Sequence, residues 1–161
     1  MQRRILIGAA MFATLVGLAI AQTKKLSADD YIEITQLYAR YNTAIDSGDA
    51  EGWAATFTPD GIFQNFKGHD ALVGFINQWR DRMGGAARRH WNTNLVITPT
   101  SDGAKGTVYL FLMDVSAKPP AILSASKYED ELVKTSDGWR FKHRVVKGDT
   151  APPPAPPATK Q

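Results

Sequence analysis

Ten residues, RRHWNTNLVI at 88–97, carry side chains that can exchange protons and hydrogen bonds. The stretch is predicted to be a β-strand, and alternate residues of a strand point to the same face of its sheet. His90, Asn92 and Asn94 are therefore expected to share one face. A neutral imidazole is a competent base near neutral pH, and each amide can donate and accept hydrogen bonds. Such a face either meets water or lines a pocket, and the strand alone leaves both interpretations open.

Further strands are predicted after this one. Hydrophobic residues alternate with polar ones along residues 88–98, 104–116, 121–135 and 138–147, and turn-forming residues or prolines separate these runs. The apolar side of the first run is expected to hold Trp91, Leu95 and Ile97. Sequential strands joined by short turns are typical of an antiparallel sheet.

A helix is predicted to come first in the folded part of the chain. Ser27 is the expected N-cap, Asp30 lies at the N3 position of a capping box, and Gly48 ends the helix. One side of this helix carries an apolar stripe formed by Tyr31, Ile34, Tyr38, Tyr41 and Ile45.

Shorter elements are predicted between this helix and the strands. A short helix carries Trp53, Ala54 and Phe57, a turn covers residues 58–61, and a short strand covers residues 62–66. Another helix opens at residues 67–70 and ends at Gly84-Gly85, and its apolar side is formed by Leu72, Phe75, Ile76 and Trp79.

This order of elements predicts an α+β fold, in which a curved antiparallel sheet wraps around about three helices that come first in the chain. We expect one domain at residues 22–149, long enough for a single hydrophobic core. A sheet curled around helices often leaves a cavity at its open end, so a ligand pocket is expected there.

Both ends of the chain differ from the rest in composition. Residues 1–21 combine a short basic start, an almost wholly apolar run and a final Ala-Ile-Ala, which predict a secretory signal peptide cleaved before Gln22. A retained membrane anchor is disfavoured because a span needs about 20 apolar residues. Residues 150–161 form a proline-rich tail that is expected to be extended or disordered. The predicted location is periplasmic or extracellular.

The predicted mature chain has little net charge. The 161 residues include 19 Lys and Arg against 16 Asp and Glu, a formal net charge of +3. Removal of Arg3 and Arg4 with the signal peptide lowers the basic count to 17 and the net charge to +1. No nucleic-acid partner is therefore expected. The sequence contains no cysteine, so the domain must rely on its core rather than on disulfides.

Nearly the whole predicted domain resembles the SnoaL-like branch of the NTF2-like superfamily, whose fold is a cone-shaped α+β barrel. The resemblance lies in LYARYNTAIDSGDAEGWAATFTPDGIF (37–63), KGHD (67–70), RRHWNTNLVI (88–97) and YEDELVKTSDGWRFKHRVV (128–146). Within that branch the chain is most similar to the group containing scytalone dehydratase, bile-acid 7α-dehydratase and lindane dehydrochlorinase. The superfamily includes enzymes, binding proteins and assembly domains, so the fold does not decide the function.

The resemblance implies a set of site residues. Asp46, near the end of the first helix, and His90, early in the first long strand, match the Asp–His pair of those enzymes. Arg144 and Phe63 match a pocket arginine and a pocket aromatic residue of the dehydrochlorinase.

Auxiliary groups of the relatives are not matched. Ile45 stands where scytalone dehydratase has a tyrosine, and Tyr41 stands where the dehydrochlorinase has a lysine. No second histidine occurs near residues 107–109. The identity of the substrate therefore cannot be transferred.

An Asp–His pair in a dry cavity can act without a cofactor. The carboxylate holds Nδ1–H of the imidazole and leaves Nε2 free to remove a proton, so an elimination or an isomerisation can follow. Arg144 or Asn94 would stabilise the charge that develops, and Asn92 would line the same face. The ring of a small hydrophobic substrate would contact Tyr38, Tyr41, Trp53 and Phe63.

Each assignment has a structural alternative. Asp46 could bind local backbone at a helix end, His90 could face solvent or the core, and the tyrosine stripe could belong to the core. Three hypotheses follow: a cofactor-independent lyase or isomerase, a non-catalytic domain that binds a small hydrophobic molecule, and an assembly module that forms a homodimer or homotrimer. The enzyme is favoured. No metal site is predicted, because His69, His90 and His143 lack a recognisable ligand spacing.

Overall fold

The computed structural model describes residues 25–84 and 87–149, so the predicted signal peptide, Gly85 and the proline-rich tail lie outside the described residues. The elements within these ranges are helices α1 (Ala28–Ser47), α2 (Ala50–Ala54) and α3 (His69–Met83), and strands β1 (Phe57–Phe63), β2 (Phe66–Lys67), β3 (Arg88–Pro99), β4 (Ala104–Asp114), β5 (Ala121–Thr135) and β6 (Gly138–Gly148). None of these helices is long and apolar enough to cross a membrane.

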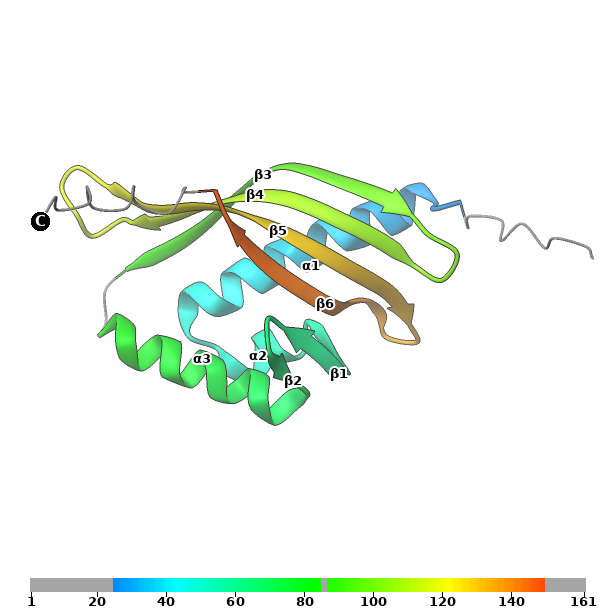
Figure 1. The fold of residues 1–161 in the computed structure, drawn as a ribbon, viewed down its shortest axis with the longest axis horizontal. Coiled ribbons are helices and arrows are strands. Elements are labelled where there is room, and N and C mark those ends of the chain that lie inside the picture. Colours follow the sequence, from blue (N-terminus) through cyan, green and yellow to red (C-terminus); the bar gives the residue numbers. More distant parts are fainter. Residues whose placement is uncertain (1–24, 85–86, 150–161) are drawn as a thin grey trace, which may run out of the picture.

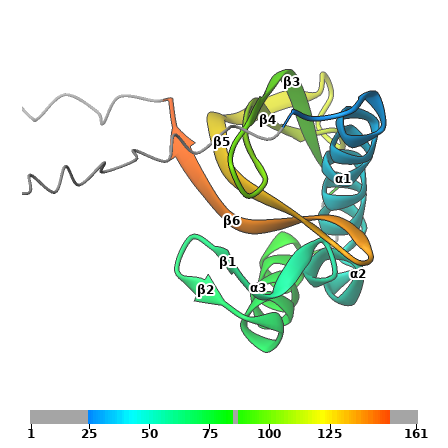
Figure 2. The same cartoon turned by 90° about the vertical axis from the view of Figure 1, so that its right-hand side faces the viewer.

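The strands form one curved sheet in the order β2-β1-β6-β5-β4-β3 (Figure 1). Strands β3 to β6 pair antiparallel, whereas β1 returns parallel to β6. The sheet curls around α1 and α3 without closing, so β2 and β3 remain its edges (Figure 2). The predicted α+β fold is therefore confirmed.

Helix α1 begins and ends as its sequence predicts. The side chain of Ser27 accepts a hydrogen bond from the backbone of Asp30, and the Asp30 carboxylate accepts one from the backbone of Ser27, which completes a capping box. Gly48 ends the helix with φ of 71°, a left-handed conformation that suits glycine. The predicted apolar stripe is buried except for Tyr31, which is 40% exposed.

The chain enters the sheet earlier than predicted after α2. Phe57 belongs to β1 and not to a helix, because the backbone of Thr56 already accepts a hydrogen bond from Phe141 of β6. The predicted turn at residues 58–61 is a bulge within β1, since Phe57 pairs with Phe141 and Ile62 with His143. The predicted strand at 62–66 is instead the end of β1 and the start of β2.

The predicted faces of β3 are correct only for its first half. Asn94 has φ of 57° and forms a bulge, and the pairing with β4 shifts between Thr93 and Val96. One extra residue reverses the side of every residue that follows. Leu95 and Ile97 therefore pack against the core, whereas Trp91 is 55% exposed.

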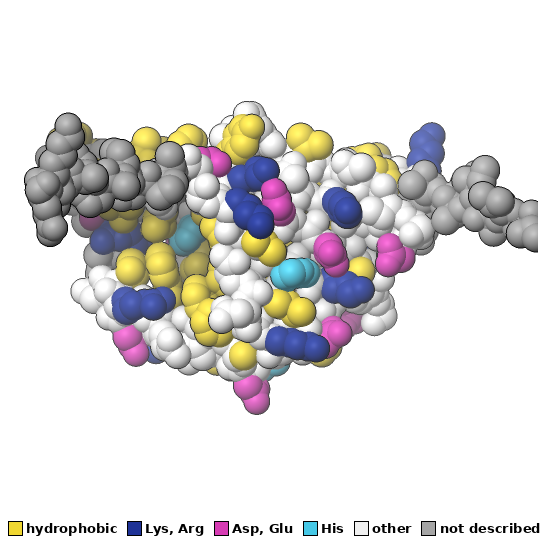
Figure 3. Space-filling model, viewed as in Figure 1, with side chains coloured by type: hydrophobic (Ala, Val, Ile, Leu, Met, Phe, Trp, Pro, Cys, Tyr) yellow, Lys and Arg dark blue, Asp and Glu magenta, His cyan; other side chains and the backbone are white. Residues whose placement is uncertain are grey.

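The core lies between α1, α2, α3 and the inner face of the sheet. It is rich in aromatic rings, including Trp53, Tyr41 and Phe141, all of them buried. On the face shown in Figure 3, hydrophobic side chains reach the surface at the lower left and along the upper edge, and charged side chains are scattered among them over the described surface.

Candidate active site

Helix α1 and strand β3 bring Asp46 and His90 into contact. Oδ1 of Asp46 lies 2.6 Å from Nδ1 of His90. The backbone N–H of His90 also donates to the same carboxylate, at 3.1 Å to Oδ1 and 3.2 Å to Oδ2. The side chains are 5% exposed for His90 and 12% exposed for Asp46. One carboxylate therefore fixes both the ring and the main chain of His90.

The remaining ring nitrogen of His90 is left unused by the protein. When Nδ1–H donates to Asp46, Nε2 has a free lone pair, and no hydrogen bond within the described residues uses Nε2. The ring of Trp79, on α3, lies 5.8 Å from the imidazole at an angle of 53°. The imidazole is thus held from two sides, and its Nε2 is not bonded to any of the described residues.

His90 lines a pocket of about 460 Å³ between α1 and the edge strand β3. The β3 side is formed by residues 90–95 and the α1 side by side chains that recur at steps of three and four. The helix contributes Thr35, Tyr38, Ala39 and Asn42, and Val108 of β4 completes the wall. Asn42 donates a hydrogen bond to Asn92, so two side-chain pairs, Asp46–His90 and Asn42–Asn92, join the helix to the strand.

The structure brings together some of the residues that the sequence singles out. His90, Tyr38, Asn92 and Asn94 line this pocket, and Asp46 holds His90 from the neighbouring side. The other predicted site residues, Tyr41, Trp53, Phe63 and Arg144, lie in the core and not in the pocket wall, with exposed fractions from 0% to 6%. Their rings pack on each other, as Tyr41 and Phe63 each lie 5.2 Å from Trp53.

Arg144 is part of a buried ion pair. Its Nε and one terminal nitrogen donate to the two oxygens of Asp130 at 2.7 and 2.8 Å, and both side chains are fully buried. The guanidinium also lies 4.0 Å from the ring of Tyr128 and 3.8 Å from that of Phe141. Burial by itself lowers the pKa of Arg144, but the Asp130 carboxylate raises it above its ordinary value. Arg144 is therefore charged and already neutralised by its partner.

Tyr38 connects the pocket to this ion pair. Its hydroxyl donates a hydrogen bond to Asp130, and burial together with the charge of Asp130 raises the pKa of Tyr38 well above its ordinary value. The phenol therefore stays protonated and offers its ring, not a proton, to the pocket. Gly106 leaves room for this arrangement, because a Cβ at that position would lie 2.1 Å from the Tyr38 hydroxyl oxygen.

Sequence reasoning missed Asn42 and Asp130, although the chain carried a signal for each. Asn42 precedes Asp46 by four residues and so lies on the same face of the helix. Asp130 alternates with Tyr128 and Leu132 on the buried face of β5.

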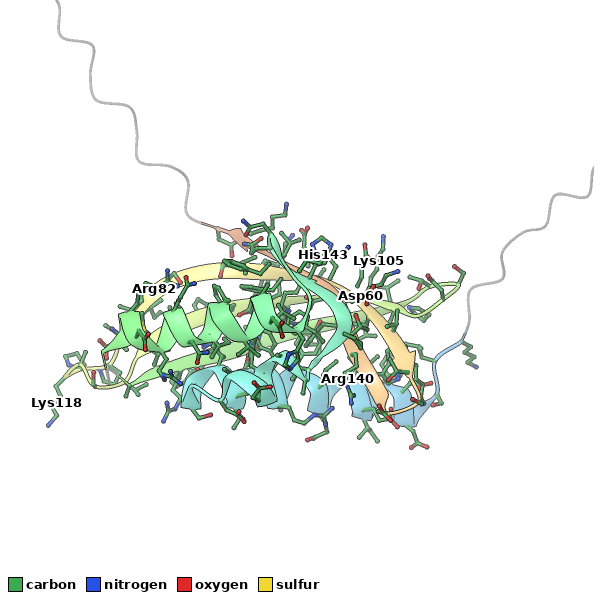
Figure 4. All side chains as sticks on the ribbon, turned by 90° about the horizontal axis from the view of Figure 1, so that it is seen from below. Asp60, Arg82, Lys105, Lys118, Arg140 and His143 are labelled. Carbon is green, nitrogen blue, oxygen red and sulfur yellow. The ribbon has the colours of Figure 1, made fainter. Side chains whose placement is uncertain are left out.

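The remaining histidines lie away from the pocket. His69 is half exposed, and its Nε2 lies 3.1 Å from Glu51. Figure 4 shows His143 near Lys105 at the margin of the molecule, apart from α1. Within residues 25–84 and 87–149, no three His, Cys, Asp or Glu side chains are grouped to hold a metal ion.

Comparison with known proteins identifies the family. The family described as SnoaL-like domain matches residues 27–145. The uncharacterized protein Rv2910c of Mycobacterium tuberculosis is 30% identical over 122 residues, which cover 72% of this chain and 83% of that protein. The anthranilate 1,2-dioxygenase small subunit of Burkholderia cepacia is 28% identical over 141 residues, which cover 75% of this chain and 88% of that subunit.

Solved structures agree with this assignment. The structure of a protein from Catenulispora acidiphila in complex with S-DNPA is 29% identical, with a TM-score of 0.69 over 76% of this chain and 96% of that one. The helices, the curved open sheet and the match over residues 27–145 together show that the chain belongs to the SnoaL-like domain family, with an NTF2-like fold.

Proposed function

We propose that this protein is a cofactor-independent lyase or isomerase that acts on a small, hydrophobic, oxygenated ring compound. His90 is the general base and Asp46 orients it. The observation that carries the proposal is the 2.6 Å contact between Asp46 and Nδ1 of His90, an enclosed residue that lines a pocket. The carboxylate selects the tautomer with Nε2 free and stabilises the imidazolium that forms when Nε2 takes a proton.

The chemistry needs no nucleophile. Nε2 of His90 removes a proton from the carbon next to a carbonyl group, and the C–H electron pair forms an enolate. In an elimination, that electron pair becomes a C=C bond as the C–O bond to a neighbouring hydroxyl breaks, and the imidazolium returns its proton to release water. In an isomerisation, the proton returns to a different carbon instead.

The pocket supports a small and largely apolar substrate. Its volume of about 460 Å³ suits a molecule of one to three rings, and the ring of Tyr38 with Ala39, Leu95 and Val108 supplies apolar wall. Asn92 and Asn94 are the amides nearest in sequence to the base, so they replace Arg144 as our candidates for stabilising an enolate oxygen. The complex of a similar protein with S-DNPA supports a ligand site in this fold.

The test is proton exchange and elimination on ring hydroxyketones. We would incubate 1-indanone and 3-hydroxy-1-indanone with the protein in D2O and follow deuteration next to the carbonyl and formation of indenone by NMR. His90→Gln should lower either rate about 10²-fold or more, and Asp46→Asn should lower it as well. The matched control is His69→Gln, which changes an exposed histidine. Equal rates for the wild type and His90→Gln would refute the proposal.

A second candidate, assembly of identical subunits, is favoured by large apolar side chains that are exposed on three neighbouring strands. Trp91, Val96, Tyr109, Ile122 and Leu123 are 47% to 61% exposed, although they are large and apolar. They lie on β3, β4 and β5, and such exposure often marks a protein interface. We propose a homodimer or homotrimer whose interface includes these residues. Light scattering should give a mass above the monomer for the wild type and a monomer for Tyr109→Glu, and a monomeric wild type would contradict the proposal.

A further inference from the structure

The pocket that His90 lines runs along the edge of β3. Residues 90–95 all line it. Successive side chains of a strand point to opposite faces of its sheet, so residues 90 and 92 lie on one face and residues 91 and 93 on the other. A cavity that reaches both faces extends around the edge of the strand. Because β3 is an edge strand, no other described strand closes the pocket on that side (Figure 2).

Exposed apolar side chains adjoin this open side. Trp91, which is 55% exposed, pairs with Phe111 of β4, and Thr93 pairs with Tyr109, which is 47% exposed. Directly paired residues of neighbouring strands have their side chains on the same face of the sheet. Trp91 and Thr93 line the pocket, and their neighbours on β4 are only one strand spacing away, about 4.8 Å. The rim of the pocket is therefore continuous with an exposed apolar surface.

This surface extends along β4 and onto β5. Val96 pairs with Thr107, which lies two residues before Tyr109 on β4. Ile122 of β5 pairs with Met113, which lies four residues after Tyr109. Residues two or four apart on a strand share a face, so Val96 and Ile122 lie on the same face as Tyr109. We call Trp91, Val96, Tyr109 and Ile122 the β3–β5 patch; their exposed fractions run from 47% to 61%.

The patch is large enough for contact between two copies of the chain. An aromatic side chain buries roughly 150–250 Å², so the half-exposed rings of Trp91 and Tyr109 together leave on the order of 200 Å². With Val96, Ile122 and the adjacent Leu123, the exposed apolar area is on the order of 400 Å². A standard interface buries about 800 Å² per partner, about 65% of it apolar in a homodimer. The patch supplies most of that apolar share, and a two-fold dimer brings the same surface from both copies.

We infer that a second copy of this chain covers the β3–β5 patch and closes the open side of the pocket, so that ligand binding and assembly are coupled. A partner that covers Trp91 and Thr93 also covers the rim that these residues form. The inference rests on the pocket of the proposed function and adds its regulation. A ligand enclosed by both copies binds the assembled protein more tightly than the monomer, and the ligand in turn stabilises the assembly.

A single thiol tests the closed rim without any ligand. The sequence contains no cysteine, so Thr93→Cys places one thiol at the rim. Ile122→Glu puts a charge in the patch but outside the pocket wall, and light scattering should show that it makes the protein a monomer. We would follow labelling by N-ethylmaleimide with mass spectrometry. The Thr93→Cys thiol should react about tenfold or more slowly in the assembled protein than in the Ile122→Glu background.

Matched controls separate this effect from a general change of the surface. Thr43→Cys is the same change at an exposed residue of α1 outside the pocket wall, and its thiol should react equally fast in both backgrounds. Ile32→Glu changes an isoleucine that is 61% exposed, as Ile122 is, but lies on α1. Ile32→Glu should keep both the assembly and the slow labelling of Thr93→Cys. Tyr109→Glu provides a second monomeric variant outside the pocket wall.

Ligand affinity is the second measurement. NMR titration with 1-indanone should give a dissociation constant about tenfold or more higher for Ile122→Glu than for the wild type and Ile32→Glu. Light scattering on dilute wild type should show more assembly when 1-indanone is added, because coupling between two binding events is reciprocal.

The outcomes separate this inference from the role of His90. Slow labelling of Thr93→Cys and tighter binding in the assembled protein, without deuterium exchange, would support the closed pocket and count against His90 as a base. Deuterium exchange together with equally fast labelling in both backgrounds would do the reverse. A monomeric wild type, which would leave residues 150–161 as the candidate cover, would overturn the inference. An assembled Ile122→Glu, or equal affinity of assembled and monomeric protein for 1-indanone, would overturn it as well.

Discussion

The buried pair of Asp130 and Arg144 can be tested by replacing Asp130 with asparagine. The carboxylate accepts two hydrogen bonds from Arg144 and one from Tyr38, and all three side chains are buried. An asparagine has one acceptor and one donor group at the same place, so its NH₂ would face an N–H of Arg144 in either orientation. The guanidinium would also lose its counter-charge in a site without water.

The expected loss is large relative to the stability of a domain of this size. Breaking a buried ion pair by removing one charge typically costs about 3–5 kcal/mol, whereas small domains unfold with about 5–15 kcal/mol in total. We therefore expect the free energy of unfolding of Asp130→Asn to fall by about 3–5 kcal/mol. The double variant Asp130→Leu with Arg144→Met should be more stable than Asp130→Asn, because it removes both charges together.

Urea denaturation followed by tryptophan fluorescence measures this change, with the free energy taken from the midpoint and the slope of each transition. The matched control is Asp81→Asn, since the side chain of Asp81 is 75% exposed and its change should cost about 0.5 kcal/mol or less. A loss below about 1 kcal/mol in Asp130→Asn would refute the assignment of Arg144 to a desolvated core pair.

Four further predictions concern other parts of the chain. Asn94→Ala should lower the free energy of unfolding by about 1–2 kcal/mol because Asn94 has φ of 57°, whereas Asn94→Gly should not lower it, as urea denaturation would show. Gly106→Ala should cost about 1–3 kcal/mol through its clash with Tyr38, whereas Gly74→Ala, in α3 with no atom within 4 Å of the added Cβ, should raise the melting temperature. The hydrogen bond from Lys134, with others from Ser27 and Trp139, holds the pKa of Asp30 well below its ordinary value, so the stability that this carboxylate provides is present above about pH 4 and is lost as the pH falls. Denaturation of the wild type and Asp30→Asn at several pH values should therefore show a difference that shrinks with acidification, and a constant difference would contradict it. We also propose that the chain is exported and cleaved before Gln22, which mass spectrometry of the mature N-terminus would show; an intact Met1 would contradict the proposal.

Local patterns were sufficient to predict most of the fold. Ser27, Asp30 and Gly48 mark the ends of α1 because capping depends on residues close in sequence. The four long strands were found because alternation and turn residues are also local. The parallel pairing of β1 with β6 joins distant segments, so no pattern near residues 57–63 could reveal it.

The bulges in β1 and β3 are features that the sequence pattern did not predict. Asn94 tolerates a left-handed conformation, but the sequence does not show whether it adopts one, and the answer decides which side of the sheet Leu95 and Ile97 occupy. The same uncertainty applied to residues 58–61, where a turn and a bulge have similar composition.

The candidate site was predictable only in part. The contact between Asp46 and His90 was expected through the family resemblance, and the structure places them together. Alternation groups Arg144 with the exposed Lys142, but the pairing of β6 with β5 shifts by one residue between Phe141 and His143 and brings Arg144 to the buried face, where Asp130 of β5 holds it in the core. The pairing of Asn42 with Asn92 likewise joins a helix to a strand and has no local signature.

The most direct test of His90 as an oriented base is its tautomer, measured by ¹⁵N NMR at a pH where the imidazole is neutral. Free histidine favours hydrogen on Nε2, so a hydrogen on Nδ1 is diagnostic of a partner at that nitrogen. We predict that His90 carries its hydrogen on Nδ1 in the wild type, with Nε2 free, and that Asp46→Asn loses this preference. Hydrogen on Nε2 in the wild type, or the same tautomer in both proteins, would contradict the role assigned to Asp46 and His90.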